Sequence, residues 1–175
     1  MNACVRRIMP TDGIALATLR HHALRVAPQA FAMSEAQLAD IDDVSWTQFC
    51  TQTATGTDAI YVVSHADVLI GMAGCRVDAS PKMAHSGLIW GMFVDPPYQH
   101  QGYGSQLLNA LITHGAAHGL QMLKLSVTVL QQSAISLYER HGFRGYAYEP
   151  ALLYIDNTEI DALHMVYRYS NGGTK

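Results

Sequence analysis

The chain has 175 residues, an apolar fraction of 49% and a formal net charge of −3 at pH 7. This length predicts a single domain, residues 1–175, with a core of ordinary size, and the composition argues against disorder. The acidic balance and the lack of a basic patch argue against nucleic acid as a partner. No apolar stretch reaches the roughly 18 residues that a membrane span requires, so no membrane association is expected.

The cysteines and the N-terminus predict a cytoplasmic location. Cys4, Cys50 and Cys75 are far apart and form no CxxC pair. The first residues contain no apolar segment of the kind found in signal peptides. We therefore expect free thiols in a cytoplasmic protein.

The first half of the chain predicts a short strand, two helical stretches and a strand pair. The strand covers residues 4–9, and Thr11 is the candidate N-cap of a helix that Pro28 ends. Ser34-x-x-Gln37 has the spacing of a capping box before a second, irregular helical stretch. The antiparallel strands are expected at 60–63 and 68–77, around the turn 64–67.

An apolar run from Leu88 to Val94 predicts a central strand that is covered on both faces. Asp95-Pro96-Pro97 ends this strand, because proline cannot donate to a ladder. Gln99-x-x-Gly102-x-Gly104 then leads into a helix that is expected to end near His118, with Gly119 as its stop. A glycine-rich turn between a buried strand and a helix N-terminus is typical of an anion cradle, most naturally for phosphate.

Spacing alone leaves a phosphate site and a plain strand-to-helix turn equally open. A nucleotide-binding transferase is one alternative, but a P-loop needs a lysine after its glycines, and none follows here. A dinucleotide fingerprint needs a third glycine at position 107, which is Leu107. Both absences count against a nucleotide site.

The second half predicts a parallel strand, a short helix and a final strand pair. Residues 122–129 alternate between apolar and polar side chains, which indicates a strand. A crossover helix before it should make this strand parallel to the 88–94 strand. A short helix over 133–141 is followed by Gly142, and two strand-like runs flank the turn Asp156-Asn157.

The glycine turn, the apolar strand before it and Leu137-Tyr138-Glu139-x-x-Gly142-Phe143 after it together resemble the GNAT superfamily of N-acetyltransferases. The resemblance implies an α/β fold whose mixed, mostly antiparallel sheet is flanked by helices and contains one parallel strand pair that splays apart. It implies acetyl-coenzyme A as the acyl-donor cosubstrate, with its pantetheine arm in that gap. The implied reaction transfers the acetyl group to a primary amine by direct attack in a ternary complex.

The same resemblance implies a set of donor-binding residues. Backbone groups of Met92, Phe93 and Val94 would bind the arm, and one N–H would polarise the thioester carbonyl. Gln131 stands where the family often has asparagine. The amides of the glycine turn would hold the pyrophosphate, with Gln99 bracing the loop. The full set is Met92, Phe93, Val94, Gln99, His100, Gln101, Gly102, Tyr103, Gly104, Ser105, Gln131 and Ala134. Gly91 fits a bulge in the strand, and tight packing against Trp90 is the alternative.

Tyr138 is the expected general acid, because the departing thiolate needs a proton. A phenol with a pKa of about 10 still carries one at neutral pH. The alternative is a core tyrosine. Some relatives place a glutamate base near position 88, which is Leu88 here, so the base is open between His85, Asp95 and water. No metal is expected, because His114-x3-His118 is interpreted as a solvent-facing pair.

The leading alternative function is a non-catalytic acyl-CoA-binding sensor or structural module of the same fold. The missing glutamate keeps this alternative open, and Tyr138 counts against it. The acceptor, a small-molecule or peptide amine, is open, as are acyl groups other than acetyl and pairing of the tail strand in a homodimer. Four acidic residues are interpreted as a solvated helix rim or as attracting a substrate ammonium: Glu35, Asp40, Asp42 and Asp43.

Overall fold

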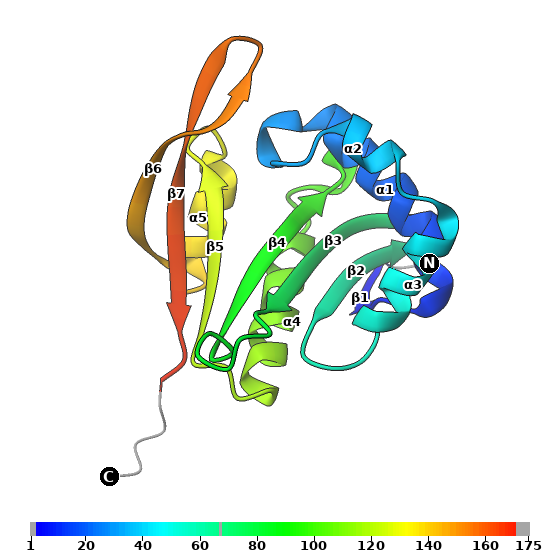
Figure 1. The fold of residues 1–175 in the computed structure, drawn as a ribbon, viewed down its shortest axis with the longest axis horizontal. Helices are drawn as coiled ribbons and strands as arrows, with labels where there is room; N and C mark the ends of the chain where they lie inside the picture. Colours follow the sequence, from blue (N-terminus) through cyan, green and yellow to red (C-terminus); the bar gives the residue numbers. More distant parts are fainter. Residues whose placement is uncertain (1–2, 67, 171–175) are drawn as a thin grey trace.

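The computed structural model describes residues 3–66 and 68–170, and a seven-stranded sheet runs through it (Figure 1). Its strand order is β1-β2-β3-β4-β5-β7-β6. The strands are β1 (Cys4–Arg7), β2 (Ala59–His65), β3 (Val68–Val77), β4 (Ser86–Val94), β5 (Met122–Thr128), β6 (Arg144–Ile155) and β7 (Thr158–Arg168). The α-helices are α1 (Gly13–Val26), α2 (Glu35–Ala39), α3 (Asp43–Thr53), α4 (Tyr103–Ala117) and α5 (Gln132–Arg140), and 3₁₀ turns lie at η1 (Pro10–Asp12), η2 (Pro28–Ala30) and η3 (Pro96–Tyr98).

The sheet is antiparallel except between β4 and β5, and this confirms the predicted fold class. The parallel ladder is short: it joins residues 86–88 to residues 122–124 and then stops. Beyond that point β4 and β5 diverge, as Figure 1 shows, while each keeps its antiparallel neighbour on the other side. The divergence opens the sheet near its middle.

Helices cover both faces of the sheet. One core lies between the strands and α4, where Leu107, Leu108 and Leu111 are completely buried. A second core lies between the strands and the α1–α3 segment, around Leu16 and Trp46. Both cores place apolar side chains at the helical spacing that the sequence predicts.

The cysteines are free, as predicted. Cys4 is exposed, and Cys50 and Cys75 are buried in the two cores. Burial raises the pKa of the Cys50 thiol to about 11 and that of Cys75 to about 12. These two thiols therefore stay protonated and inert at neutral pH.

Several local predictions hold and others need correction. The capping box at Ser34 is confirmed, since Ser34 and Gln37 exchange backbone and side-chain hydrogen bonds. The single irregular helical stretch is in fact two helices, α2 and α3. The final hairpin turns at Asp156 and Asn157, both with positive φ. Asp67, which the sequence assigns to the turn 64–67, lies outside the described residues.

The start of α1 differs from the prediction. Thr11 does not cap the helix. Asp12 instead accepts two hydrogen bonds from the Arg6 guanidinium, at 2.6 and 2.9 Å, and one from the Met9 amide at 2.7 Å. A bidentate ion pair thus ties β1 to the turn that begins α1.

This pair predicts a pH dependence of stability. Arg6 lowers the pKa of Asp12 from its ordinary value of 3.8, so the unfolded chain takes up this proton first as the pH falls. The stabilisation is complete above pH 3.8 and is lost as the pH falls through the folded pKa. Asp12→Asn should lower Tm at pH 7 and flatten the acid limb of a Tm against pH curve. The exposed Asp40→Asn is the control and should change neither.

His114 corrects the expected solvent-facing histidine pair. Its side chain is buried, its Nε2 lies 2.8 Å from the Thr57 carbonyl oxygen, and its ring stacks on His118 at 4.1 Å between centroids. Burial lowers the pKa of His114. The neutral His114 ring can therefore be buried beside the leucines of α4, because it forms a hydrogen bond with the Thr57 carbonyl oxygen.

Leu88 corrects a second expectation. β4 is central in the sheet, as predicted, but Leu88 is 40% exposed. One face of this strand is therefore incompletely covered. Within the described residues, no helix combines the length and hydropathy needed to cross a membrane.

Candidate active site

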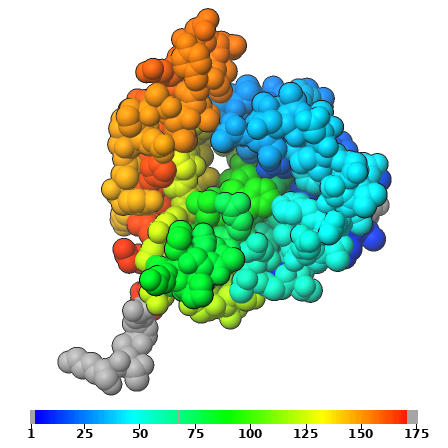
Figure 2. Space-filling model, viewed as in Figure 1, coloured from blue at the N-terminus to red at the C-terminus, as the bar shows by residue number. Residues whose placement is uncertain are grey.

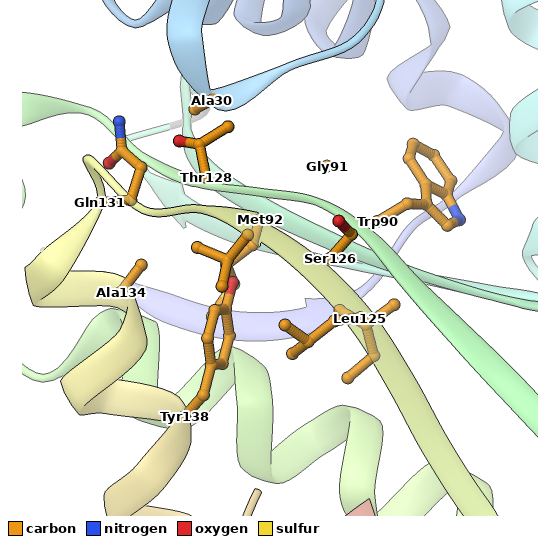
Figure 3. A pocket seen from close by; sticks show the side chains of 12 residues that line it. Ala30, Trp90, Gly91, Met92, Leu125, Ser126, Thr128, Gln131, Ala134 and Tyr138 are labelled. Atoms are coloured by element: carbon orange, nitrogen blue, oxygen red, sulfur yellow. The ribbon is translucent and has the colours of Figure 1, made fainter. Parts of the chain in front are cut away.

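A cavity lies where β4 and β5 separate. Figure 2 shows the molecular surface hollowed between the yellow strand and the blue helical segment, next to green β4. The lining comes from β4, β5, η2 and α5, and Figure 3 shows Tyr138 extending from α5 toward Met92 on β4. The lining residues are Ala30, Ile89, Trp90, Gly91, Met92, Leu125, Ser126, Val127, Thr128, Gln131, Ala134 and Tyr138.

The β4 wall of the cavity contains a bulge at Gly91. Phe93 pairs with Met72 and Trp90 with Gly74, so Gly91 and Met92 together oppose one residue of β3. Gly91 has a φ of +63°, which side chains with a Cβ rarely adopt. The predicted bulge is thus present, and it turns the β4 backbone toward the cavity.

Gly91→Ala should weaken both the fold and the site. The left-handed φ costs roughly 1–2 kcal/mol for alanine. The added Cβ would also lie 3.0 Å from the Arg20 Nη1 and Met72 Cε atoms. We expect a loss of this size in the free energy of unfolding, measured by urea denaturation, and a loss of function at the cavity. Gly56→Ala is the matched control, since Gly56 has a φ of +85° in open space and should lose stability alone.

The Gln99 side chain ties the glycine loop to the end of β4. The Gln99 side-chain amide donates to the Val94 carbonyl oxygen at 2.9 Å. Met92 lines the cavity, whereas the Phe93 side chain is buried against the α1 side of the sheet. Phe93 is not among the lining residues, so its backbone role, which the family resemblance implies, stays a prediction.

The N-terminus of α4 is open to a ligand. Gly102 precedes the helix with a φ of +85°, and no side chain caps the first turn. The first amides of the helix, at Tyr103, Gly104 and Ser105, have no acceptor within the helix. His100 is exposed, and the Gln101 side chain donates to the Pro97 carbonyl oxygen at 3.3 Å. This arrangement favours an anion at the helix end.

The helix end and the cavity are linked through α5. A Cβ on Gly104 would lie 3.2 Å from Leu137 Cδ2, so α4 begins in close contact with the residue next to Tyr138. Gln131 and Ala134, at the start of α5, line the cavity itself. A ligand of extended shape can thus contact the cavity at one end and the α4 amides at the other.

Tyr138 extends from α5 into the gap between the strands. Figure 3 shows its hydroxyl end beside Met92. The side chain is only 5% exposed, and burial raises its pKa well above the usual value of a phenol. The hydroxyl therefore keeps its proton at neutral pH and lies at the cavity that Met92 and Gln131 also line. Tyr138 is therefore a core residue, as the alternative interpretation predicts, and it also lines the cavity.

The residues named as candidate bases lie apart from Tyr138. His85 precedes β4 at the far end of the strand, about 20 Å along the backbone from Gly91. Asp95 follows β4, and its Oδ1 lies 2.6 Å from His22 Nε2. Neither residue lines the cavity.

Two of the four acidic residues of the α2–α3 segment, Glu35 and Asp42, have local partners. Asp42 is the N-cap of α3 and accepts a hydrogen bond from the Ser45 amide at 2.7 Å. Glu35 Oε1 lies 3.3 Å from Arg25 Nη1. None of the four acidic residues lines the cavity. The structure therefore favours the solvated helix rim over an ammonium site.

Several residues at the cavity were not predicted. Ser126 and Thr128 occupy the polar face of β5, and their alternation was visible in the sequence. The Thr128 hydroxyl donates to the Gln29 carbonyl oxygen at 3.1 Å, which ties η2 to the cavity rim. Arg20 lies next to Gly91. The sequence does contain a sign of this, because Arg20 is a charged residue between Leu16 and Ala23 on the apolar face of a helix.

The chain is similar to solved structures and to curated proteins that are described as acetyltransferases. A protein from Streptococcus pneumoniae described as an acetyltransferase of the GNAT family superposes with a TM-score of 0.87 over 96% of this chain and all of its own, at 22% identity. The protein yncA from Salmonella typhimurium, solved with its cofactor acetyl-CoA, has a TM-score of 0.84 over 100% of this chain and 98% of its own, at 18% identity. At these identities the likeness concerns the fold.

Curated relatives match shorter segments. The [ribosomal protein bS18]-alanine N-acetyltransferase of Haemophilus ducreyi is 34% identical over 77 residues, which are 44% of this chain and 50% of that protein. N-alpha-acetyltransferase 30 of Xenopus laevis is 26% identical over 99 residues, 57% of this chain and 33% of that protein. The match thus spans half or less of these relatives. The family model described as the acetyltransferase (GNAT) family matches residues 21–143, more than half of the chain, and the chain therefore belongs to the GNAT family of acetyltransferases.

Proposed function

We propose that the protein transfers an acetyl group from acetyl-CoA to a primary amine by direct attack in a ternary complex. The observation that carries this proposal is the protonated, buried Tyr138 in the gap between β4 and β5. A bulged strand lies beside it and an open helix N-terminus lies beyond it. Family membership and the relatives named N-acetyltransferases support the same reaction.

The residues present fit the donor. Unpaired amides at the start of α4 suit the pyrophosphate. Beyond residue 88, β4 has no ladder partner on its β5 side, so its backbone can pair with the amide groups of the pantetheine arm. Gln131 offers an amide donor and acceptor at the cavity rim. We assign donor binding to these groups, with Gln99 holding the end of β4 in place.

Tyr138 completes the proton balance. The amine nitrogen attacks the thioester carbonyl carbon, and an N–H of the bulged β4 backbone stabilises the oxygen that becomes negative. When the carbon–sulfur bond breaks, the thiolate takes the proton of the Tyr138 hydroxyl. The proton that the amine loses passes to water, which then restores the phenol.

The amine must be unprotonated before it attacks. For an amine with a pKa of about 10.4, this costs on the order of 4–5 kcal/mol at neutral pH. Position 88 carries leucine rather than a glutamate base, and His85 and Asp95 lie outside the cavity lining. We therefore propose that the amine loses its proton to solvent. The unprotonated fraction of the amine grows with pH, so kcat/KM should rise through the neutral range.

The free thiols support a cytoplasmic location. For a homodimer, β6 is the edge strand that we assign to pairing, and Tyr146 and Tyr148 are exposed on it. Both assignments are part of the proposal.

The decisive experiment is calorimetric titration with acetyl-CoA, followed by thiol release against a panel of amines. We expect saturable binding and thiol release with one class of amine. Binding without turnover on every amine would establish the acyl-CoA sensor instead. An absence of binding would remove the site assignment.

A further inference from the structure

Arg20 is a buried cation beside the cavity. It projects from α1, its exposed fraction is 7%, and its Nη1 atom has no hydrogen-bond partner among the described residues. Arginine is almost never fully buried unless it is paired. Burial lowers the pKa of Arg20, but a guanidinium remains charged at any physiological pH.

The surroundings of this guanidinium are apolar. Its central carbon lies 5.8 Å from the Phe31 ring centroid and 5.5 Å from that of Trp90. Nη2 contacts the Met33 sulfur at 3.6 Å. Aromatic faces stabilise a cation by about 0.5–2 kcal/mol each, which is less than burying an unpaired charge costs. The site therefore lacks an anionic partner.

Gly91 places Nη1 next to the cavity. A Cβ on Gly91 would lie 3.0 Å from this atom, and Gly91 itself lines the cavity. No side chain at position 91 separates the guanidinium from the space beside the bulge. Met33 covers the guanidinium from the other side, but its flexible side chain is 37% exposed and can move aside.

We propose that Arg20 receives the carboxylate of the acceptor, and that the acceptor is a small amino acid rather than a simple amine or a protein N-terminus. This inference rests on the proposed acetyl transfer. The phosphates of the donor are assigned to the α4 amides, and its pantetheine arm is neutral. The acceptor is therefore the ligand that brings a negative charge to this end of the cavity.

A polar part of the cavity wall is available for the amino group. Ser126 lines the cavity and is paired in register with His164 on β7, so the two side chains share a face. His164 Nε2 lies 2.6 Å from Glu149 Oε2. The Ser126 hydroxyl can accept a hydrogen bond from an ammonium, and the Glu149 carboxylate adds a negative charge on the same face of the sheet.

The native enzyme provides the first test. Thiol release is measured with the twenty common L-amino acids, their carboxamides and the corresponding decarboxylated amines. We expect at least one amino acid to exceed its carboxamide by about 100-fold or more in kcat/KM. Equal rates for acids and amides would overturn the inference while leaving acetyl transfer intact. Failure of every amine would instead contradict the proposed function.

Variants of Arg20 provide the second test. Arg20→Met keeps an unbranched, flexible side chain without the charge, and it should reduce the preference for acid over amide to less than about threefold. Arg20→Lys should restore part of it. Arg25→Met is the control on the same helix, because Arg25 is an exposed partner of Glu35, and it should keep the full preference. A purely structural arginine would lower both rates together and leave their ratio unchanged, which would refute the assignment.

Discussion

Replacing Tyr138 by phenylalanine is expected to lower kcat for acetyl transfer about 100-fold, which is within the usual contribution of a general acid. The substitution removes the hydroxyl and keeps the ring that packs against Phe143 at 5.9 Å. The free energy of unfolding and the KM for acetyl-CoA should therefore change little. Steady-state thiol release at saturating substrates measures the effect.

The dependence of this loss on the leaving group identifies the role of Tyr138. If Tyr138 protonates the thiolate, the loss should shrink with a thioester whose thiol is more acidic, because such a leaving group needs no proton. Tyr154→Phe is the control, since Tyr154 is 69% exposed on the outer hairpin. Full turnover by Tyr138→Phe at saturating substrate would show that this phenol is not the acid.

The second large effect is expected at the helix that holds the pyrophosphate. Ser105 is the third residue of α4, where an aspartate normally stabilises a helix through the macrodipole. In Ser105→Asp the same carboxylate would face the pyrophosphate. Two like charges about 5 Å apart repel by about 3 kcal/mol at an effective dielectric constant of 20. The Kd for acetyl-CoA should therefore rise about 100-fold while Tm stays level or increases.

Ser105→Asn is the matched control for this substitution. It has nearly the same shape as aspartate and carries no charge, so the Kd for acetyl-CoA should stay within a few-fold of the native value. High salt should reduce the difference between the two variants, because exposed charges are screened. Equal affinities in calorimetric titrations at low salt would place the pyrophosphate elsewhere.

The strand-turn-helix segment around residues 88–118 was predictable because its signals are local. An apolar run, two prolines and a glycine at positive φ specify a strand, its end and a helix start without reference to the rest of the chain. The crossover rule then specifies a parallel neighbour. The position of Gly91 inside the strand suggested either a bulge or tight packing, and the structure contains the bulge.

Other features depend on contacts between distant segments. His114 is acceptable in the core because Thr57, 57 residues away in the chain, supplies a carbonyl oxygen. Arg20 is adjacent to Gly91 only after α1 packs across the sheet. The start of α1 likewise depends on the ion pair between Asp12 and Arg6 on β1, and not on a cap by Thr11. Periodicity within one helix contains no information about such partners.

The short β4–β5 ladder also has a consequence for cooperativity. Only the pairs at residues 86–88 and 122–124 join the two strands, so β5, β7 and β6 can open as a unit separate from β1–β4. A cosubstrate lying across the gap would bind both units and couple their opening free energies. Amide hydrogen exchange should then slow on β5 and β7 when acetyl-CoA is added, including at residues that never contact it.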